Sequence, residues 1–238
     1  MGASGIGLPL APAFPSLAGD VPFAEALALL RHRIVPLFQP VKKVLLFLPR
    51  GFEMYEASAF IDVIGWNLVD GDGSTKLLTA GFTRDVASSF DQRMTVDLLF
   101  EDVRVDDFDA LALPGGFIEF DFYREAYDER LLGLIREFDR ARKPIAAICV
   151  AALLLGKSGV LKGRRCTTYN QKGRIRQKTL AGFGADVVNE PVVEDGAIIT
   201  CWGPATGMEV AFRLLERLTD RQRADFIRGI MGFEPRSD

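Results

Sequence analysis

The chain has 238 residues, of which 48% are hydrophobic, enough for one sizeable core and too apolar for an intrinsically disordered protein. Its 29 basic and 32 acidic residues leave a formal net charge of -3, so no general attraction to nucleic acid or to an anionic membrane is expected. The cysteines Cys149, Cys166 and Cys201 are too few for a disulfide scaffold and favour a reducing, cytoplasmic location. Since His32 is the only histidine and no Cys-x-x-Cys pair occurs, no metal site is expected.

The N-terminal region, residues 1–41, is predicted to be a tail followed by a helix. Residues 1–20 are rich in Pro, Gly and Ala and carry no Lys or Arg, so a secretory signal is not expected. Asp20 and Pro22 can begin a helix, and leucines at near-helical spacing predict one over 22–37. No apolar run is long enough to predict a membrane span. Residues 42–238 are expected to form one domain.

From residue 42 onward, short apolar runs alternate with amphipathic segments. In chain order the pattern predicts a strand at 43–48, a helix at 53–66, strands at 77–82 and 108–113, a helix at 128–142, a strand at 144–149, a helix at 150–158, a strand at 165–169, a basic helix at 171–183, strands near 186–189 and 197–201 flanking the turn 194–196, and helices at 206–219 and 221–231. This alternation predicts an α/β fold with a parallel sheet covered on both faces. Ligands of such sheets bind at the carboxyl ends of the strands.

One of these strand ends carries a cysteine. The strand 144–149 runs directly into a helix, with Cys149 at the junction, which is the layout of a nucleophile elbow. A helix N-terminus with free N–H groups favours a thiolate there. The alternative is a buried, inert cysteine.

Two other strand ends could contribute to the same edge of the sheet. Gly115 and Gly116 follow the strand 108–113, and amides freed at such a turn can hold an oxyanion, although a simple tight turn would look the same. Glu53 and Glu56 lie three apart on the first turn of a helix, where acidic residues also merely satisfy the helix dipole. A carboxyl close to a thiolate would have a raised pKa and could donate a hydrogen bond.

A basic stretch runs from Lys162 to Lys178, with seven Lys or Arg residues and no acid. Its simplest interpretation is a solvated face. The sharper hypothesis is an anion site near the mouth of the pocket.

Four segments together resemble the DJ-1/PfpI superfamily, also called ThiJ/PfpI, over roughly residues 42–220. They are KVLLFLPRGFEMYEASAFIDV, DALALPGG, PIAAIC and IITCWGPATGMEVAF. The resemblance implies a flavodoxin-like three-layer sandwich with a mostly parallel central sheet, in a protein that is usually a homodimer. No cofactor is expected.

The resemblance also assigns roles to residues. It places the reactive elbow cysteine at Cys149 and its acidic partner at Glu56, with Glu53 nearby on the same turn. The oxyanion amides would be those of Gly116 and Val150.

This sequence departs from the family pattern where other members have a histidine. Val150 directly follows the cysteine, and Tyr169 ends the Thr-Thr-Tyr segment. No Cys-His dyad is therefore expected, and peptidase activity is not expected either. Tyr169 can donate a hydrogen bond, but a phenol with a pKa of about 10 is a poor base at neutral pH. Trp202 and Arg50 are further candidates for lining the pocket.

Three functions remain open on these grounds. The first is an enzyme in which Cys149 acts on a small electrophilic molecule in a hydrolase-, hydratase- or glyoxalase-like reaction. The second is a redox-sensing stress-response protein whose Cys149 is oxidised to a sulfinate held by Glu56. The third is a non-catalytic, chaperone-like dimer.

Overall fold

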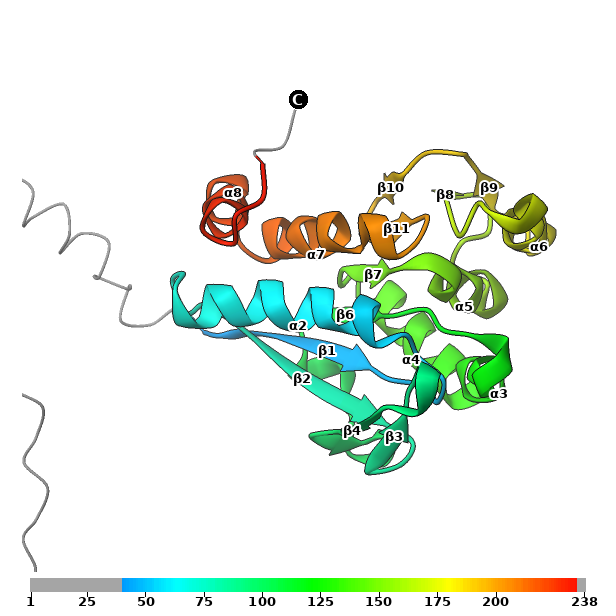
Figure 1. Cartoon of the computed structure of the whole chain (residues 1–238), viewed down its shortest axis with the longest axis horizontal. Helices are drawn as coiled ribbons and strands as arrows, with labels where there is room; N and C mark the ends of the chain where they lie inside the picture. The colour runs from blue at the N-terminus through cyan, green and yellow to red at the C-terminus, as the bar shows by residue number, and fades with distance from the viewer. Residues whose placement is uncertain (1–39, 235–238) are drawn as a thin grey trace, which may run out of the picture. The chain divides into compact units, whose positions relative to one another are not determined.

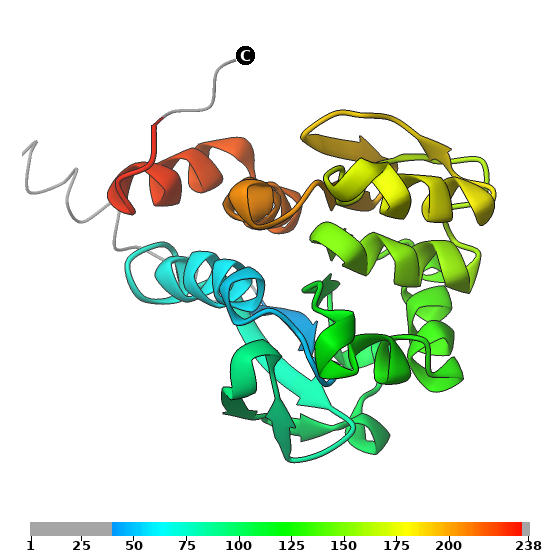
Figure 2. The same cartoon turned by 45° about the vertical axis from the view of Figure 1, so that its right-hand side comes forward.

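The computed structural model describes residues 40–234, shown in two views in Figures 1 and 2. They belong to the second of two compact units, Phe38–Asp238, into which the chain divides after Met1–Leu37. The predicted helix at 22–37 lies outside the described residues, as does His32. Within residues 40–234, no helix is both long enough and apolar enough to cross a bilayer.

The centre of the described unit is a seven-stranded sheet. Its strands are β1 (Lys42–Phe47), β2 (Thr75–Gly81), β5 (Leu98–Leu99), β6 (Ala110–Leu113), β7 (Ile145–Ala147), β10 (Val192–Asp195) and β11 (Ile198–Cys201), in the order β10-β11-β7-β6-β1-β2-β5. All neighbours are parallel except β10 and β11. The five strands β2-β1-β6-β7-β11 reproduce the 2-1-3-4-5 order of flavodoxin-like folds.

Helices cover both faces of this sheet. One group consists of α2 (Met54–Val69), α7 (Pro204–Leu218) and α8 (Arg221–Ile230), which pack against one another. The other consists of α4 (Glu129–Arg140) and α5 (Ala152–Ser158), with α3 (Phe122–Ala126) and α6 (Ile175–Gly182) beside them. The predicted three-layer sandwich with a mostly parallel sheet is thereby confirmed.

The inner parallel strands are apolar on both faces, because helices cover both sides of the sheet. In β1, Lys42 and Lys43 are exposed, but residues 44–48 are completely buried between the two helix layers. Residues 110–113 of β6 and 145–147 of β7 are equally buried. A strand that is apolar without alternation can satisfy both faces only in the middle of such a sandwich.

Two predicted elements near the C-terminus are corrected. The segments 165–169 and 186–189 contribute only two residues each, β8 (Arg165–Cys166) and β9 (Asp186–Val187), which pair in a small parallel sheet of their own. The strand that pairs with β11 across the turn is β10 instead, and Asp195 pairs with Ile198. Strand β10 lies at the edge of the sheet and needs only one apolar face. Its polar end therefore breaks the apolar pattern from which a strand is predicted.

Several short elements were not predicted. A hairpin of β3 (Asp85–Ala87) and β4 (Arg93–Thr95) follows β2. Single turns of 3-10 helix occur at η1 (Ser89–Asp91), η2 (Phe100–Asp102), η3 (Val105–Asp107), η4 (Ile118–Phe120), η5 (Cys149–Ala151) and η6 (Lys172–Arg174). The basic helix expected at 171–183 begins only at Ile175, because residues 172–174 all have positive φ.

Candidate active site

The carboxyl ends of three neighbouring strands carry the residues singled out in the sequence. β1, β6 and β7 are adjacent in the sheet and lead into Glu53, Gly115 and Cys149 respectively. The direction of strand addition reverses between β1 and β6, and ligands of open α/β sheets bind at such a reversal.

Cys149 occupies a backbone conformation that side-chain-bearing residues rarely adopt. Its φ is +58°, between β7 and the turn that opens α5. A non-glycine residue in this region costs on the order of 1–3 kcal/mol and persists only where its surroundings hold it. Part of that support comes from Thr168, whose hydroxyl donates a 2.7 Å hydrogen bond to the Cys149 carbonyl oxygen. The sharp elbow leaves Cys149 7% exposed at the base of a cavity.

The two glycines after β6 allow the backbone to approach this elbow. A Cβ on Gly115 would lie 2.8 Å from Oε2 of Glu56 and 3.1 Å from the Cys149 Cβ. A Cβ on Gly116 would lie 2.4 Å from the Phe122 ring. Only glycine therefore fits at either position. The Gly115 N–H donates a 2.6 Å hydrogen bond to Oε2 of Glu56, so this amide is engaged by the carboxyl rather than open to the cavity.

Glu56 is a completely buried carboxyl in the first turn of α2. Its second oxygen, Oε1, is buried without a hydrogen-bond partner of good geometry among the described residues. Burial raises the pKa of Glu56 well above its usual range, and the charge of Glu53 raises it further, while the Gly115 N–H opposes the change. Burial also raises the pKa of Glu53. The site therefore favours a protonated Glu56.

The Cys149 thiol is subject to the same effects. Burial raises its pKa well above the usual range, the charge of Glu56 adds to this, and the Val150 N–H opposes it. Burial therefore opposes the thiolate that the helix N-terminus favours. Because both groups are buried side by side, the Cys149 sulfur and the Glu56 carboxyl cannot both carry a negative charge. A thiolate therefore forms only while Glu56 keeps its proton.

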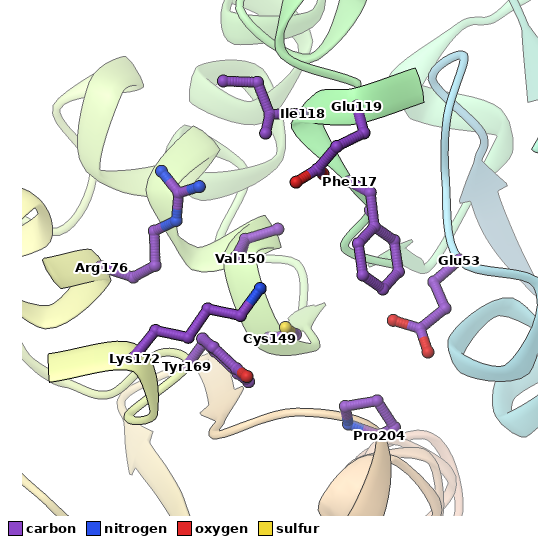
Figure 3. Close-up of a pocket in the computed structure, with 11 residues that line it drawn as sticks. Glu53, Phe117, Ile118, Glu119, Cys149, Val150, Tyr169, Lys172, Arg176 and Pro204 are labelled. Carbon is purple, nitrogen blue, oxygen red and sulfur yellow. The ribbon is translucent and has the colours of Figure 1, made fainter. Parts of the chain in front are cut away.

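A cavity of about 200 Å³ opens above the sulfur (Figure 3). Its lining comes from the three strand ends and from the segment around α6: Glu53, Gly116, Phe117, Ile118, Glu119, Cys149, Val150, Tyr169, Lys172, Arg176 and Pro204. The candidates Cys149, Glu53, Gly116, Val150 and Tyr169 are thus brought together, with Glu56 buried beneath them.

Two candidate pocket residues lie elsewhere. Arg50 is exposed and paired with Asp121 at 3.6 Å, outside the lining. Trp202 is also absent from the lining, and its Nε1 is buried without a hydrogen-bond partner within residues 40–234. Sequence reasoning missed Phe117 and Ile118, whose one signal was their position directly after the Gly-Gly turn.

Among residues 40–234, no three His, Cys, Asp or Glu side chains converge closely enough to hold an ion. The carboxyl-thiol cluster is instead suited to moving a proton to and from sulfur.

Comparison with known proteins gives this arrangement a family. The sequence model of the DJ-1/PfpI family matches residues 42–217. The chain belongs to the DJ-1/PfpI family. The crystal structure of DJ-1beta from Drosophila melanogaster superposes with a TM-score of 0.71 at 27% identity, covering 81% of this chain and 98% of that one.

Two curated relatives in the DJ-1/PfpI comparison differ in length from this chain. Protein DJ-1 homolog A of Arabidopsis thaliana is 30% identical over 195 residues, which are 82% of this chain and 47% of that protein. A deglycase of Pyrococcus abyssi is 35% identical over 122 residues, 51% of this chain and 69% of that protein. The chain thus spans about half the length of the Arabidopsis relative.

Proposed function

We propose that the chain is an enzyme in which the Cys149 sulfur adds to the electrophilic carbon of a small molecule, such as an aldehyde. One observation carries the proposal: Cys149 sits on a strained elbow at the base of a cavity, next to the buried carboxyl of Glu56. Strain that the surroundings must hold is typical of functional positions. The similarity to a deglycase agrees with an enzymatic role.

The proposed addition needs one proton to move. The sulfur-carbon bond forms as the carbonyl π pair moves to oxygen, and the thiol proton ends on that oxygen. Glu56, with Glu53 beside it, relays the proton, because burial raises the pKa of both carboxyls and so favours their protonated forms. The amides of Gly116 and Val150 line the cavity and stabilise the negative oxygen while it develops.

This proposal replaces a Cys-His dyad with a carboxyl-assisted thiol. The only histidine of the chain, His32, lies outside the family match at 42–217. Tyr169 lines the cavity and supplies a hydroxyl donor rather than a base. Peptide hydrolysis, which needs a strong base and a protonated leaving group, is accordingly not proposed.

Turnover by wild type and by Cys149→Ser tests the proposal. Both proteins are incubated with methylglyoxal and with an isonitrile, and substrate loss is followed. The matched control is Cys166→Ser, which changes a buried thiol that does not line the cavity. We expect turnover in wild type and in the control, and none in Cys149→Ser. Equal turnover in all three proteins, or none in any, would sink the proposal.

A second candidate function is oxidation sensing. The buried, unpartnered Oε1 of Glu56 can hold a proton toward an oxygen placed on sulfur. Two equivalents of peroxide would convert the Cys149 thiolate to a sulfinate with release of two waters. Mass analysis after peroxide treatment decides this: a gain of two oxygens at Cys149 without turnover of any carbonyl compound favours the sensor over the enzyme.

We also propose that the protein works as a homodimer in a reducing compartment such as the cytoplasm. The outer face of α2 leaves Trp66 38% and Val69 78% exposed, more apolar surface than one isolated residue would give. All three cysteines are free thiols, which agrees with the proposed reducing compartment.

Sedimentation of the full chain tests the dimer, with Val69→Lys as the variant. A monomeric wild type contradicts the proposed dimer. A dimer with an unreactive Cys149 would favour the chaperone-like alternative.

A further inference from the structure

The cavity wall opposite Glu53 consists of two cationic side chains, Lys172 and Arg176 (Figure 3). Lys172 belongs to η6 and Arg176 to the first turn of α6, four positions later. Both residues line the cavity, and Figure 3 shows the Lys172 ammonium directed toward Cys149, with Arg176 at the edge of the cavity.

Neither cation is neutralised by a carboxylate among the described residues. Arg164 and Arg213 illustrate the usual arrangement, with carboxylate partners at 2.5 Å and 2.7 Å. Arg176 instead stacks over the Tyr123 ring, with its guanidinium carbon 5.3 Å from the ring centre. This contact holds the side chain while leaving its N–H groups available for a ligand.

The backbone that carries Lys172 is strained. Lys172, Gly173 and Arg174 have φ values of +50°, +68° and +58°, a full left-handed turn in which only one residue is glycine. In the described part of the chain, neither the Lys172 nor the Arg174 side chain makes a hydrogen bond that would offset the strain of this backbone. Its effect is to bring the Lys172 ammonium to the cavity instead of continuing α6 outward.

We propose that the wall formed by Lys172 and Arg176 binds the carboxylate of the substrate, so that the molecule attacked by Cys149 is a small carbonyl acid of the 2-oxo acid or glyoxylate class. This inference rests on the proposed function of the same site. A planar guanidinium and an ammonium together match a carboxylate. Because the cavity holds only about 200 Å³, the carboxylate and the electrophilic carbon must belong to one small molecule.

The acidic residues of the lining orient such a substrate. Glu119 and Glu53 lie across the cavity from the two cations (Figure 3). The cations attract a carboxylate to their side of the cavity, and Glu119 and Glu53 disfavour it on the opposite side. A neutral aldehyde would receive no such orientation.

Charge selection at Cys149 can be measured without any turnover. Iodoacetate and iodoacetamide react with the same sulfur and differ by one negative charge. The ratio of their rates at Cys149, divided by the same ratio for glutathione, reports whether the cavity favours an anion. Lys172→Gln and Arg176→Gln remove the proposed cations. Lys178→Gln is the matched control, since Lys178 is exposed on the same helix and does not line the cavity.

We expect a normalised ratio above unity in wild type and in Lys178→Gln. Each cavity variant should lower the ratio by roughly 1.5- to 5-fold, the size expected for a solvent-accessible charge pair. A ratio that the double variant Lys172→Gln/Arg176→Gln leaves unchanged overturns the proposal.

Equilibrium binding separates this proposal from the proposed function. Cys149→Ala is titrated with pyruvate and with pyruvamide, its neutral counterpart, with and without the two cation substitutions. A preference for pyruvate that disappears in the cation variants supports carboxylate binding by Lys172 and Arg176. This holds even if Cys149 of wild type reacts with neither alkylating agent; in that case only the proposed function fails. Equal affinity for pyruvate and pyruvamide overturns the proposed carboxylate binding by Lys172 and Arg176.

Discussion

Replacing Glu56 by glutamine tests the protonation state of the carboxyl beside the Cys149 sulfur. Burial raises the folded-state pKa of Glu56 well above the ordinary value of 4.5. The folded protein therefore keeps a proton that the unfolded chain releases. The stability that this proton contributes is fully present below about pH 4.5 and is lost as pH rises toward the folded pKa, by at most about 1.4 kcal/mol per pH unit.

Glutamine cannot ionise, so Glu56→Gln removes this dependence. Its amide oxygen can still accept the hydrogen bond from the Gly115 N–H. Near pH 5 we expect the variant to lie within about 1 kcal/mol of wild type, the usual net value of one hydrogen bond. As pH rises to about 8, wild type should lose stability relative to the variant. The raised pKa of Cys149 acts only above its ordinary value of 9.0, outside this range.

Urea unfolding of both proteins between about pH 5 and 8 measures the difference in the free energy of unfolding. Glu119→Gln makes the same chemical change on an exposed carboxyl of the same cavity and serves as the control. Parallel curves for wild type and Glu56→Gln would refute the reasoning. A variant that becomes less stable relative to wild type at higher pH would show that Glu56 is ionised in the folded state.

Three further substitutions, two at the site and one in helix α4, are followed by urea unfolding. Gly116→Ala should destabilise the fold by on the order of 1–3 kcal/mol, since its Cβ would lie 2.4 Å from the Phe122 ring; an unchanged stability would contradict that close approach. Thr168→Val should lower the free energy of unfolding by about 1 kcal/mol, because it leaves the buried Cys149 carbonyl without its 2.7 Å hydrogen bond. It should also slow the alkylation of Cys149. A loss of stability without slower alkylation would show that the elbow geometry does not depend on this hydrogen bond. Gly133→Ala should stabilise helix α4 by about 0.5–1 kcal/mol, since its Cβ would meet only an arginine tip at 3.7 Å, and a destabilised variant would refute this.

Much of the fold could be predicted from local patterns. The run from Val44 to Leu48 is apolar without alternation, and a strand buried on both faces is the element that such a run forms. The junction at Cys149 was also readable, because an apolar strand led into a helix with no turn residues between them.

The features that could not be predicted from the sequence depend on contacts between residues distant in the chain or on unusual backbone conformations. Glu56 and Gly115 are 59 positions apart, and only the folded sheet shows that one donates to the other. The left-handed turn that carries Lys172 looked helical, since two of its three residues are ordinary helix formers. The edge strand β10 was missed because Glu194 and Asp195 give it a polar end.

The balance of charges at the elbow could not be read from the sequence either. A helix N-terminus favours a thiolate, and burial opposes it. Which effect is larger depends on how deeply Cys149 and Glu56 are enclosed, and that depth is set by the packing of α2 and β6 around them.

The most direct test of the central claim is the alkylation of the three cysteines by iodoacetamide at pH 7, followed peptide by peptide. Cys166 and Cys201 are internal controls, because both are fully buried and burial raises their pKa values to about 12 and about 11. The account predicts that Cys149, which lines the cavity, reacts at least tenfold faster than either of the two enclosed thiols. A Cys149 that reacts no faster than the two buried thiols would contradict it.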